Sequence, residues 1–187
     1  HGDTSQTPSK DDQSGFNQDV EIVGDAKATN FSPYSVSDGF HSVEFFNDGS
    51  NSEHLVFGPG GATDFNLNKN SDWCAEFWVY LHVTPDQYDR VAEQYSGADY
   101  WAIKFSQGSG QLGKINIGRT DTPGTGLLQS AEALPLNQWV HVAFTSDSTN
   151  DILRVFVNGA LSNSASNWSS ITSSMWSDAT SAHSLQG

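Results

Sequence analysis

The sequence predicts an all-β protein built as a two-sheet antiparallel sandwich. Short runs of alternating apolar and polar residues recur about every eight to twelve positions, which is the strand spacing of such folds. The chain also holds 17 Gly and 6 Pro among many Ser, Thr, Asn and Asp residues, and these residue types favour tight turns. No segment shows the apolar period of about 3.6 residues that marks an amphipathic helix.

The chain divides into a polar arm and one domain. Residues 1–19 are mostly polar and are expected to form an arm or a long loop. No internal repeat divides the remainder, so residues 20–187 are expected to form a single domain, in which the Ser-, Thr- and Asn-rich stretch 162–174 is irregular. The strands predicted from alternation and turn residues are 20–23, 42–46, 54–57, 73–83, 90–95, 100–105, 114–118, 127–129, 139–145 and 152–157.

The clearest strand is expected over residues 73–83, where both faces carry large apolar groups. We expect a central strand that is covered on one face and partly on the other. The same pattern places Trp78 and Trp139 in the core and favours buried, hydrogen-bonded histidines at His82 and His141. One face holds Trp73, Ala75, Phe77, Val79, Leu81 and Val83, and the other holds Cys74, Glu76, Trp78, Tyr80 and His82. Further along the chain, Asn158-Gly159 predicts a hairpin turn after strand 152–157.

The charge balance excludes several classes of partner. The chain has 22 acidic and 8 basic residues and a net charge of -14. Such a surface repels phosphate backbones and anionic lipid, so we expect no nucleic-acid partner and no membrane insertion. Cys74 is the single cysteine, so no internal disulfide is possible, and its place in an apolar strand favours a packing role over a nucleophilic one.

Three segments carry a resemblance to a known family. They are residues 75–81 (AEFWVYL), 134–143 (LPLNQWVHVA) and 153–159 (LRVFVNG), in an order and spacing that resemble the laminin-G-like branch of the concanavalin A-like lectin/glucanase superfamily. The resemblance implies a two-sheet antiparallel jelly roll. It also implies ligand binding through rim loops or the concave face, often of glycans and sometimes with calcium as a cofactor.

The wider pattern, including residues 24–26 and 31–34, is similar to modules in structural proteins of marine tailed phages. Members of this family open with an apolar strand before the polar arm and close with a strand after a glycine pair. This chain is therefore expected to lack the family's first and last strands. Open sheet edges favour cover by a neighbouring chain, so we expect an oligomeric assembly located at a virion surface or outside a cell.

Enzymatic chemistry is not expected. Glycosidases of this fold carry paired carboxylates on one strand face, commonly as Glu-x-Asp-x-Glu, because one acts as nucleophile and one as acid. That motif is absent here, and no two glutamates lie within five positions of each other. The histidines show no paired zinc-ligand spacing either, so the sequence predicts no catalytic residues.

The sequence offers candidate residues for a calcium site and for a sugar-binding site. Calcium favours several oxygen ligands from loops, and the weak candidates near predicted turns are Asp48, Asp64 and Asp72. Sugars stack on exposed aromatic rings beside polar groups, and the leading ligand-binding residues are Tyr95, Asp99, Tyr100 and Trp101. Neighbouring strand residues face opposite ways, so only one ring of the Tyr100-Trp101 pair is expected to be available. The aromatic residues at strand ends or in loops, of which at least two are expected to be exposed, are Tyr34, Tyr88, Tyr95, Tyr100, Trp101, Trp168 and Trp176.

These observations favour a non-catalytic recognition module, carbohydrate-binding or adhesive, displayed on a larger assembly such as a phage virion and contacting cell-surface glycan. One alternative is a purely structural capsid-decoration, tail or fibre protein that contacts other virion proteins. A further alternative is a glycoside hydrolase on the same fold, which the missing carboxylate motif disfavours. Exposed aromatic rings beside polar groups would favour recognition, whereas an apolar patch poor in carboxylates would favour assembly.

Overall fold

The computed structural model describes residues 20–24, 26–35, 37, 40–45, 54–57, 67, 71–85, 89–94, 101–106, 110–119, 127–168 and 183–186. The polar arm over residues 1–19 lies outside the described residues. Every labelled element is a strand. Within the described part of the chain, no helix has the length and apolar character needed to cross a membrane.

Ten of the thirteen strands that the structure describes coincide with predicted elements. In chain order they are β1 (Val20–Val23), β2 (Lys27–Thr29), β3 (Ser42–Glu44), β4 (His54–Phe57), β5 (Trp73–Tyr80), β6 (Arg90–Gln94), β7 (Trp101–Phe105), β8 (Ile115–Arg119), β9 (Leu128–Gln129), β10 (Trp139–Asp147), β11 (Ile152–Val157), β12 (Ala160–Ser166) and β13 (His183–Gln186).

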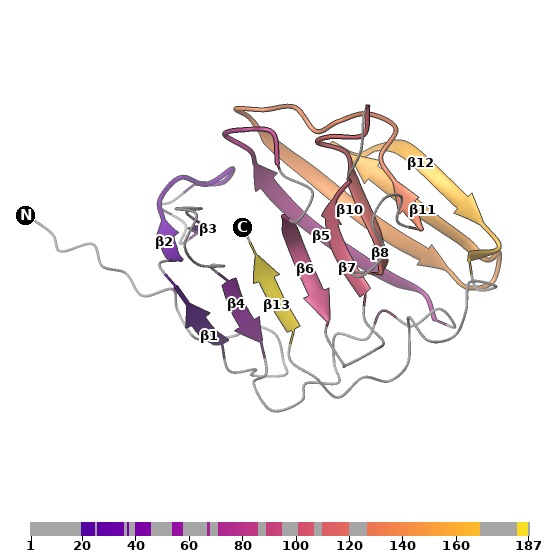
Figure 1. Ribbon diagram of the computed structural model, residues 1–187, viewed down its shortest axis with the longest axis horizontal. Coiled ribbons are helices and arrows are strands. Elements are labelled where there is room, and N and C mark those ends of the chain that lie inside the picture. Colours follow the sequence, from indigo (N-terminus) through magenta and orange to yellow (C-terminus); the bar gives the residue numbers. More distant parts are fainter. Residues whose placement is uncertain are drawn as a thin grey trace, which may run out of the picture.

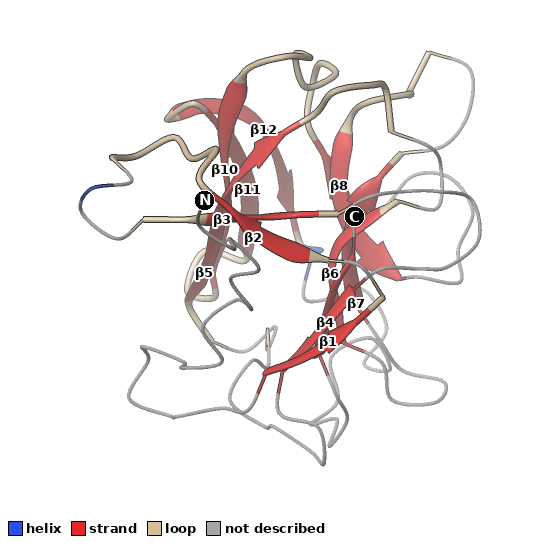
Figure 2. Cartoon of the chain, turned by 90° about the vertical axis from the view of Figure 1, so that its left-hand side faces the viewer, coloured by secondary structure: helices blue, strands red, loops and turns tan. Residues whose placement is uncertain are grey.

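Two large antiparallel sheets face each other, as Figures 1 and 2 show. One has seven strands in the order β1-β4-β13-β6-β7-β8-β9, and the other has four in the order β12-β11-β10-β5. A small sheet pairs β2 with β3. All paired strands run antiparallel. The prediction of an all-β, two-sheet antiparallel jelly-roll sandwich is confirmed.

The core lies between the two large sheets. Alternate residues of β10 and β11 point into it and meet alternate residues of β7 and β8, since successive side chains of a strand point to opposite faces. Fully burying one such side chain contributes about 1.5–3 kcal/mol. The buried cluster comprises Trp101, Ile103, Phe105, Ile115, Ile117, Leu128, Leu134, Val140, Val142, Phe144, Leu153, Val155 and Trp168.

The register between β5 and β10 determines which residues face outward. Val79 lies opposite the fully buried Val140, so the alternate pairs, Tyr80 opposite Trp139 and Trp78 opposite His141, occupy the outer face of the four-stranded sheet. The expectation that both tryptophans lie in the core is therefore wrong, and Trp78 is 39% exposed. Both faces of these strands are apolar, and alternation alone does not say which face meets the other sheet.

The two histidines are also less buried than expected. His82 is exposed, and His141 is half-buried. His82 follows the end of β5 at Tyr80, so it lies beyond the paired part of the strand, which ends earlier than the predicted residue 83. His141 lies on the outer face, where the second sheet does not cover it.

Three strands have no counterpart in the sequence prediction, namely β2, β12 and β13. β12 overlaps the stretch expected to be irregular, and it is a sheet edge whose polar residues pair with β11 through their backbone.

The predicted turn at Asn158-Gly159 is confirmed: it joins β11 to β12 with φ values of 49° and 77°. β13 lies between β4 and β6. The single domain and the lack of the family's first and last strands stay predictions.

Candidate functional site: an aromatic face on the four-stranded sheet

A group of aromatic side chains covers the outer face of the four-stranded sheet near β5. We call it the aromatic face and define it as Phe31, Tyr34, Phe40, Trp78, Tyr80 and Trp139. Three of these residues come from β5 and β10, and three come from the connection between β2 and β3, residues 30–41. Figure 2 shows this connection on the side of β5 and β10 that faces away from the seven-stranded sheet.

Local hydrogen bonds shape the connection. The backbone N of Phe31 donates to Thr29 Oγ1 and that of Tyr34 donates to Ser32 Oγ, each at 3.2 Å. In both bonds a hydroxyl oxygen accepts from the backbone N two residues further on, a pattern that favours turns over regular structure. The Oγ of Ser42 on β3 donates to the carbonyl oxygen of Phe31 and ties the start of the connection to its end.

One part of the aromatic face is a cluster of three rings, in which Phe31 is 47% exposed. The ring of Phe31 lies 4.7 Å from that of Tyr80, nearly perpendicular to it, and 5.3 Å from that of Trp139. The rings of Tyr80 and Trp139 are 5.6 Å apart. Aromatic pairs of this kind contribute about 0.5–1.5 kcal/mol beyond their buried area. Phe31 therefore anchors the connection to the sheet.

The other part also presents rings to solvent. Tyr34 is 51% exposed, Phe40 is 53% exposed and Trp78 is 39% exposed. The ring of Tyr34 lies 5.3 Å from that of Phe40 and 5.7 Å from that of Trp78, to which it is nearly perpendicular. Rings held by such contacts keep a defined orientation while part of their surface stays open to a ligand.

A carboxylate and an imidazole lie beside these rings. Glu76 Oε2 is 3.4 Å from His141 Nε2, and the side chain of Glu76 is 65% exposed. The ring of His141 is 5.2 Å from that of Trp78. The backbone of His141 is held by Asn158, whose Oδ1 accepts from His141 N at 2.9 Å and whose N donates to His141 O at 2.8 Å. The aromatic face thus combines apolar ring surface with an exposed hydrogen-bond acceptor.

Of the four predicted ligand-binding residues, the structure describes Trp101. Trp101 begins β7, is only 6% exposed and belongs to the core cluster, so its ring offers no open face for stacking. Only one ring of the Tyr100-Trp101 pair was expected to be available, and Trp101 is not that ring, because the seven-stranded sheet directs it toward the second sheet. Tyr95, Asp99 and Tyr100 lie outside the described residues. Of the other aromatic residues named from the sequence, Tyr34 is exposed as expected and Trp168 is buried.

Sequence reasoning missed Trp78 as a surface residue, although a usable signal was present. Trp78 shares a strand face with Glu76 and His82, while the opposite face of that strand is entirely apolar. The mixed face is the better candidate for solvent exposure, because a face covered by another sheet excludes unpaired charge.

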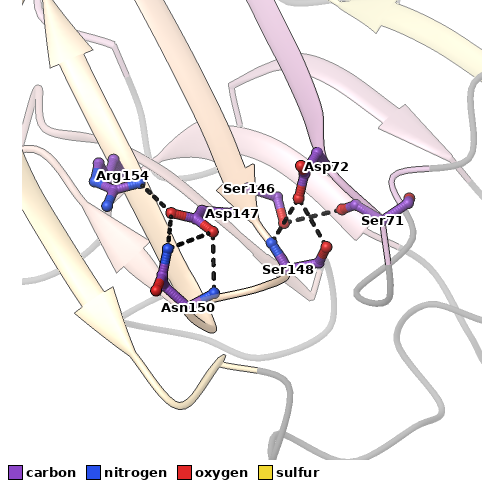
Figure 3. A network of polar contacts seen from close by, with 7 residues as sticks. All are labelled: Ser71, Asp72, Ser146, Asp147, Ser148, Asn150 and Arg154. Carbon is purple, nitrogen blue, oxygen red and sulfur yellow. Dashed lines mark hydrogen bonds and ion pairs between the residues drawn. The ribbon is translucent and has the colours of Figure 1, made fainter.

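Asp72, a calcium candidate, takes part in a hydrogen-bond network at the opposite end of β5 (Figure 3). Its Oδ1 accepts from both N and Oγ of Ser148 at 2.7 Å, and these bonds lower the pKa of the carboxyl. Asp147 accepts from the side chain and backbone N of Asn150 and from Arg154 at 3.4 Å, and its pKa is lowered mainly by the Asn150 bonds.

The described residues contain no group of three or more His, Cys, Asp or Glu side chains arranged to hold a metal ion. The other two calcium candidates, Asp48 and Asp64, lie outside the described residues. Calcium binding therefore stays a prediction, and the two hydrogen bonds from Ser148 to Asp72 are those of a structural hydrogen-bond acceptor.

Comparison with known proteins places this architecture in a family. The sequence profile of the concanavalin A-like lectin/glucanases superfamily, laminin-G type, matches residues 45–184. No curated protein matches the chain in sequence. Among solved structures, domain 4 of AbnA, an extracellular GH43 arabinanase from Geobacillus stearothermophilus in complex with arabinotriose, aligns with a TM-score of 0.60 and 13% identity, over 89% of this chain and 72% of that one.

An endo-1,3-β-glucanase from Streptomyces sioyaensis aligns with a TM-score of 0.41 and 12% identity, over 72% of this chain and 57% of that one. At these identities the structural similarities concern the fold alone. The profile match covers most of the chain and agrees with the observed two-sheet architecture. The chain belongs to the concanavalin A-like lectin/glucanase superfamily.

Proposed function

We propose that this domain is a non-catalytic carbohydrate-recognition module that binds glycan through the aromatic face. The observation that carries the proposal is the exposure of Tyr34, Phe40 and Trp78 beside the Glu76–His141 pair. The C–H faces of a sugar ring stack on aromatic rings, and its hydroxyl groups donate to carboxylate oxygens.

The family supports this proposal without deciding it, because one fold hosts many functions. Domain 4 of AbnA, which shares the fold, is a domain of an extracellular enzyme and binds arabinotriose. By analogy, the present domain acts outside a cell or on a displayed surface, including that of a virion, where it contacts cell-surface glycan.

The positions of carboxylates on the four-stranded sheet support a non-catalytic role. Glu76 lies opposite Ala143, and Asp147 lies four positions further along β10, about 13 Å away at the rise of a β-strand. Glycosidase carboxylates stand about 5–9.5 Å apart. The Asp147 carboxylate is also bonded to Asn150 and Arg154, so Glu76 has no catalytic partner on this face of the described sheet.

A second candidate function is assembly through protein–protein contacts, as in a capsid-decoration, tail or fibre protein. It is favoured by exposed apolar side chains near the Tyr80–Trp139 end of the face, where Val83 is 73% exposed and Leu136 is 38% exposed. Charged residues are depleted at the centres of protein interfaces. The exposed carboxylate of Glu76 therefore favours a glycan over a protein partner.

A glycan-array screen of the 187-residue chain, run with calcium and again with EDTA, tests the proposal. We expect binding to a defined sugar class, and loss of about tenfold or more in affinity on Trp78→Ala or Tyr34→Ala, as for a hot-spot side chain. Leu161→Ala removes an equally exposed apolar side chain from β12, at the other edge of the same sheet, and is the matched control.

Two outcomes would redirect the proposal. Binding that survives Trp78→Ala and Tyr34→Ala would place the glycan site away from the aromatic face. No binding to any glycan by folded protein, together with concentration-dependent self-association that Leu136→Asp abolishes, would favour the assembly function. Loss of glycan binding in EDTA would show that binding requires calcium.

A further inference from the structure

The charges around the aromatic face are distributed unevenly. The four strands of its sheet hold three Asp, Glu, Lys or Arg side chains, namely Glu76, Asp147 and Arg154. Arg154 lies opposite Thr145 and its Nη1 is 3.4 Å from Asp147 Oδ2, so the single cation of these strands is paired at the end remote from Trp78. Lys27, on the neighbouring β2, lies opposite Glu44 in the register. Apart from His141, which carries a charge only when protonated, the strands therefore bring no cation to the rings.

Glu76 brings a negative charge to the place where a ligand would stack. It precedes Trp78 by two residues and so shares its strand face. Its carboxylate is 3.4 Å from His141, whose ring is 5.2 Å from that of Trp78. The side chain is 65% exposed, so its oxygens remain accessible to a bound molecule as well as to His141.

Resting on the proposed glycan-binding function, we infer that the aromatic face selects uncharged sugar chains and rejects uronic, sialic and sulfated ones, with Glu76 as the residue that determines this selectivity. A sugar ring stacked beside Trp78 donates its hydroxyl groups to the Glu76 carboxylate in charge-assisted hydrogen bonds. An acidic group on the same sugar brings a second anion close to that carboxylate, and the sheet has no free Lys or Arg side chain there to neutralise it.

Local and global electrostatic effects differ in their response to salt. The net charge of -14 repels every anionic ligand, but this long-range repulsion is screened beyond about 8 Å at physiological ionic strength. A direct contact between a ligand anion and Glu76 is screened much less. If the preference for neutral glycans persists when salt is raised from 0.15 M to about 0.5 M, it is caused by Glu76. If the preference vanishes, it is caused by the net charge.

The test uses an array on which each neutral glycan stands beside its acidic counterpart: methyl-esterified and free oligogalacturonate, desialylated and sialylated chains, desulfated and sulfated chains. We expect the wild-type chain to bind the neutral member of a pair about tenfold more tightly at 0.5 M salt. Glu76→Gln keeps the size of the side chain and removes its charge. It should weaken neutral binding by a few fold, strengthen acidic binding and reduce the ratio between them to near unity.

Glu132→Gln is the matched control, because it removes the same charge from an exposed residue in the loop that contacts β12 at the far edge of the sheet. It should leave the ratio unchanged, and thermal melting should show that both variants are folded. Equal binding of neutral and acidic partners by the wild-type chain, or a ratio that Glu76→Gln leaves intact, overturns this inference alone. Failure of the folded wild-type chain to bind any glycan overturns the proposed function and this inference together.

Discussion

Asp72 and Ser148 join two parts of the four-stranded sheet that are 76 residues apart in the chain. Asp72 immediately precedes β5, the edge strand, and Ser148 opens the turn between β10 and β11. The carboxylate accepts two hydrogen bonds of 2.7 Å, and Ser146 Oγ donates to Ser71 O beside it at 3.2 Å (Figure 3). These bonds hold the start of β5, which is the end remote from Trp78 and Tyr80. Because one partner is a carboxylate, they make the stability of the fold depend on pH.

Acidification should destabilise the fold through Asp72. Its pKa is lowered from 3.8 by the hydrogen bonds from Ser148, so the stabilisation is present above that unfolded-state value and is lost as the pH falls through the lower folded-state pKa. We expect Asp72→Asn to have a lower free energy of unfolding than wild type at pH 7. On acidification to pH 3 its free energy of unfolding should fall less than that of wild type. Urea unfolding at pH 7 and at pH 3 measures both differences. Glu132→Gln, an exposed carboxylate outside this network, should follow the wild-type profile, and an identical profile for Asp72→Asn would contradict the prediction.

Burial should determine how much an aliphatic substitution destabilises the fold. Ile117 on β8 is fully buried in the core, so Ile117→Val should lower the free energy of unfolding by about 0.5–1.5 kcal/mol. Val83 is 73% exposed, and Val83→Ala should change it by no more than about 0.5 kcal/mol. Chemical denaturation of the two variants beside wild type gives both values. Equal costs would mean that the two sheets do not pack through β8 as described.

Phe31 should control the order of the connection between β2 and β3. Its ring contacts Tyr80 and Trp139, and these contacts are lost in Phe31→Ala. Amide hydrogen exchange in residues 30–41 should accelerate by about three- to tenfold, the change expected from losing one or two aromatic pairs. Exchange mass spectrometry on peptides from this segment measures the effect, and peptides from β7 and β8 serve as the internal reference. Leu161→Ala should leave the segment unchanged, and unaltered exchange in Phe31→Ala would show that the ring is not the anchor.

The pKa of the Cys74 thiol depends on the charge of Glu76, so it measures that charge without any ligand. The two side chains share the outer face of β5, and the pKa of the thiol is raised, first by burial and then by the negative charge of Glu76. Burial disfavours the thiolate, and a nearby anion disfavours it further. Glu76→Gln should therefore lower the pKa of the thiol and increase its alkylation rate at pH 8, with Glu132→Gln as control. The pH profile of iodoacetamide alkylation gives this pKa, and a value that does not fall would remove Glu76 as a significant charge at this face.

Much of the fold could be predicted from local sequence. Alternation identified β5 and β10 as strands and sorted the residues of β5 into two faces. Val79, from one of these faces, pairs with Val140, and Trp78, from the other, pairs with His141. The Asn158-Gly159 turn was equally readable, because both residues tolerate the positive φ that a two-residue hairpin requires. Such features depend on residues close together in the chain, and their physical causes are local.

The sequence by itself determined the fold class, the family and the composition of each strand face, because a period of two residues sorts side chains without reference to the rest of the molecule. Only the tertiary structure decided which face became the core. The seven-stranded sheet covers the side of Val140 and leaves Trp78 outside, and it turns Trp101 inward. Residues 30–41 then bring Phe31, Tyr34 and Phe40 across the exposed side of β5. Contacts between segments so distant in sequence depend on how the sheets pack, and alternation alone does not encode them. The local signal for the exposed side of β5 was Glu76, a charged residue on the same strand face as Trp78.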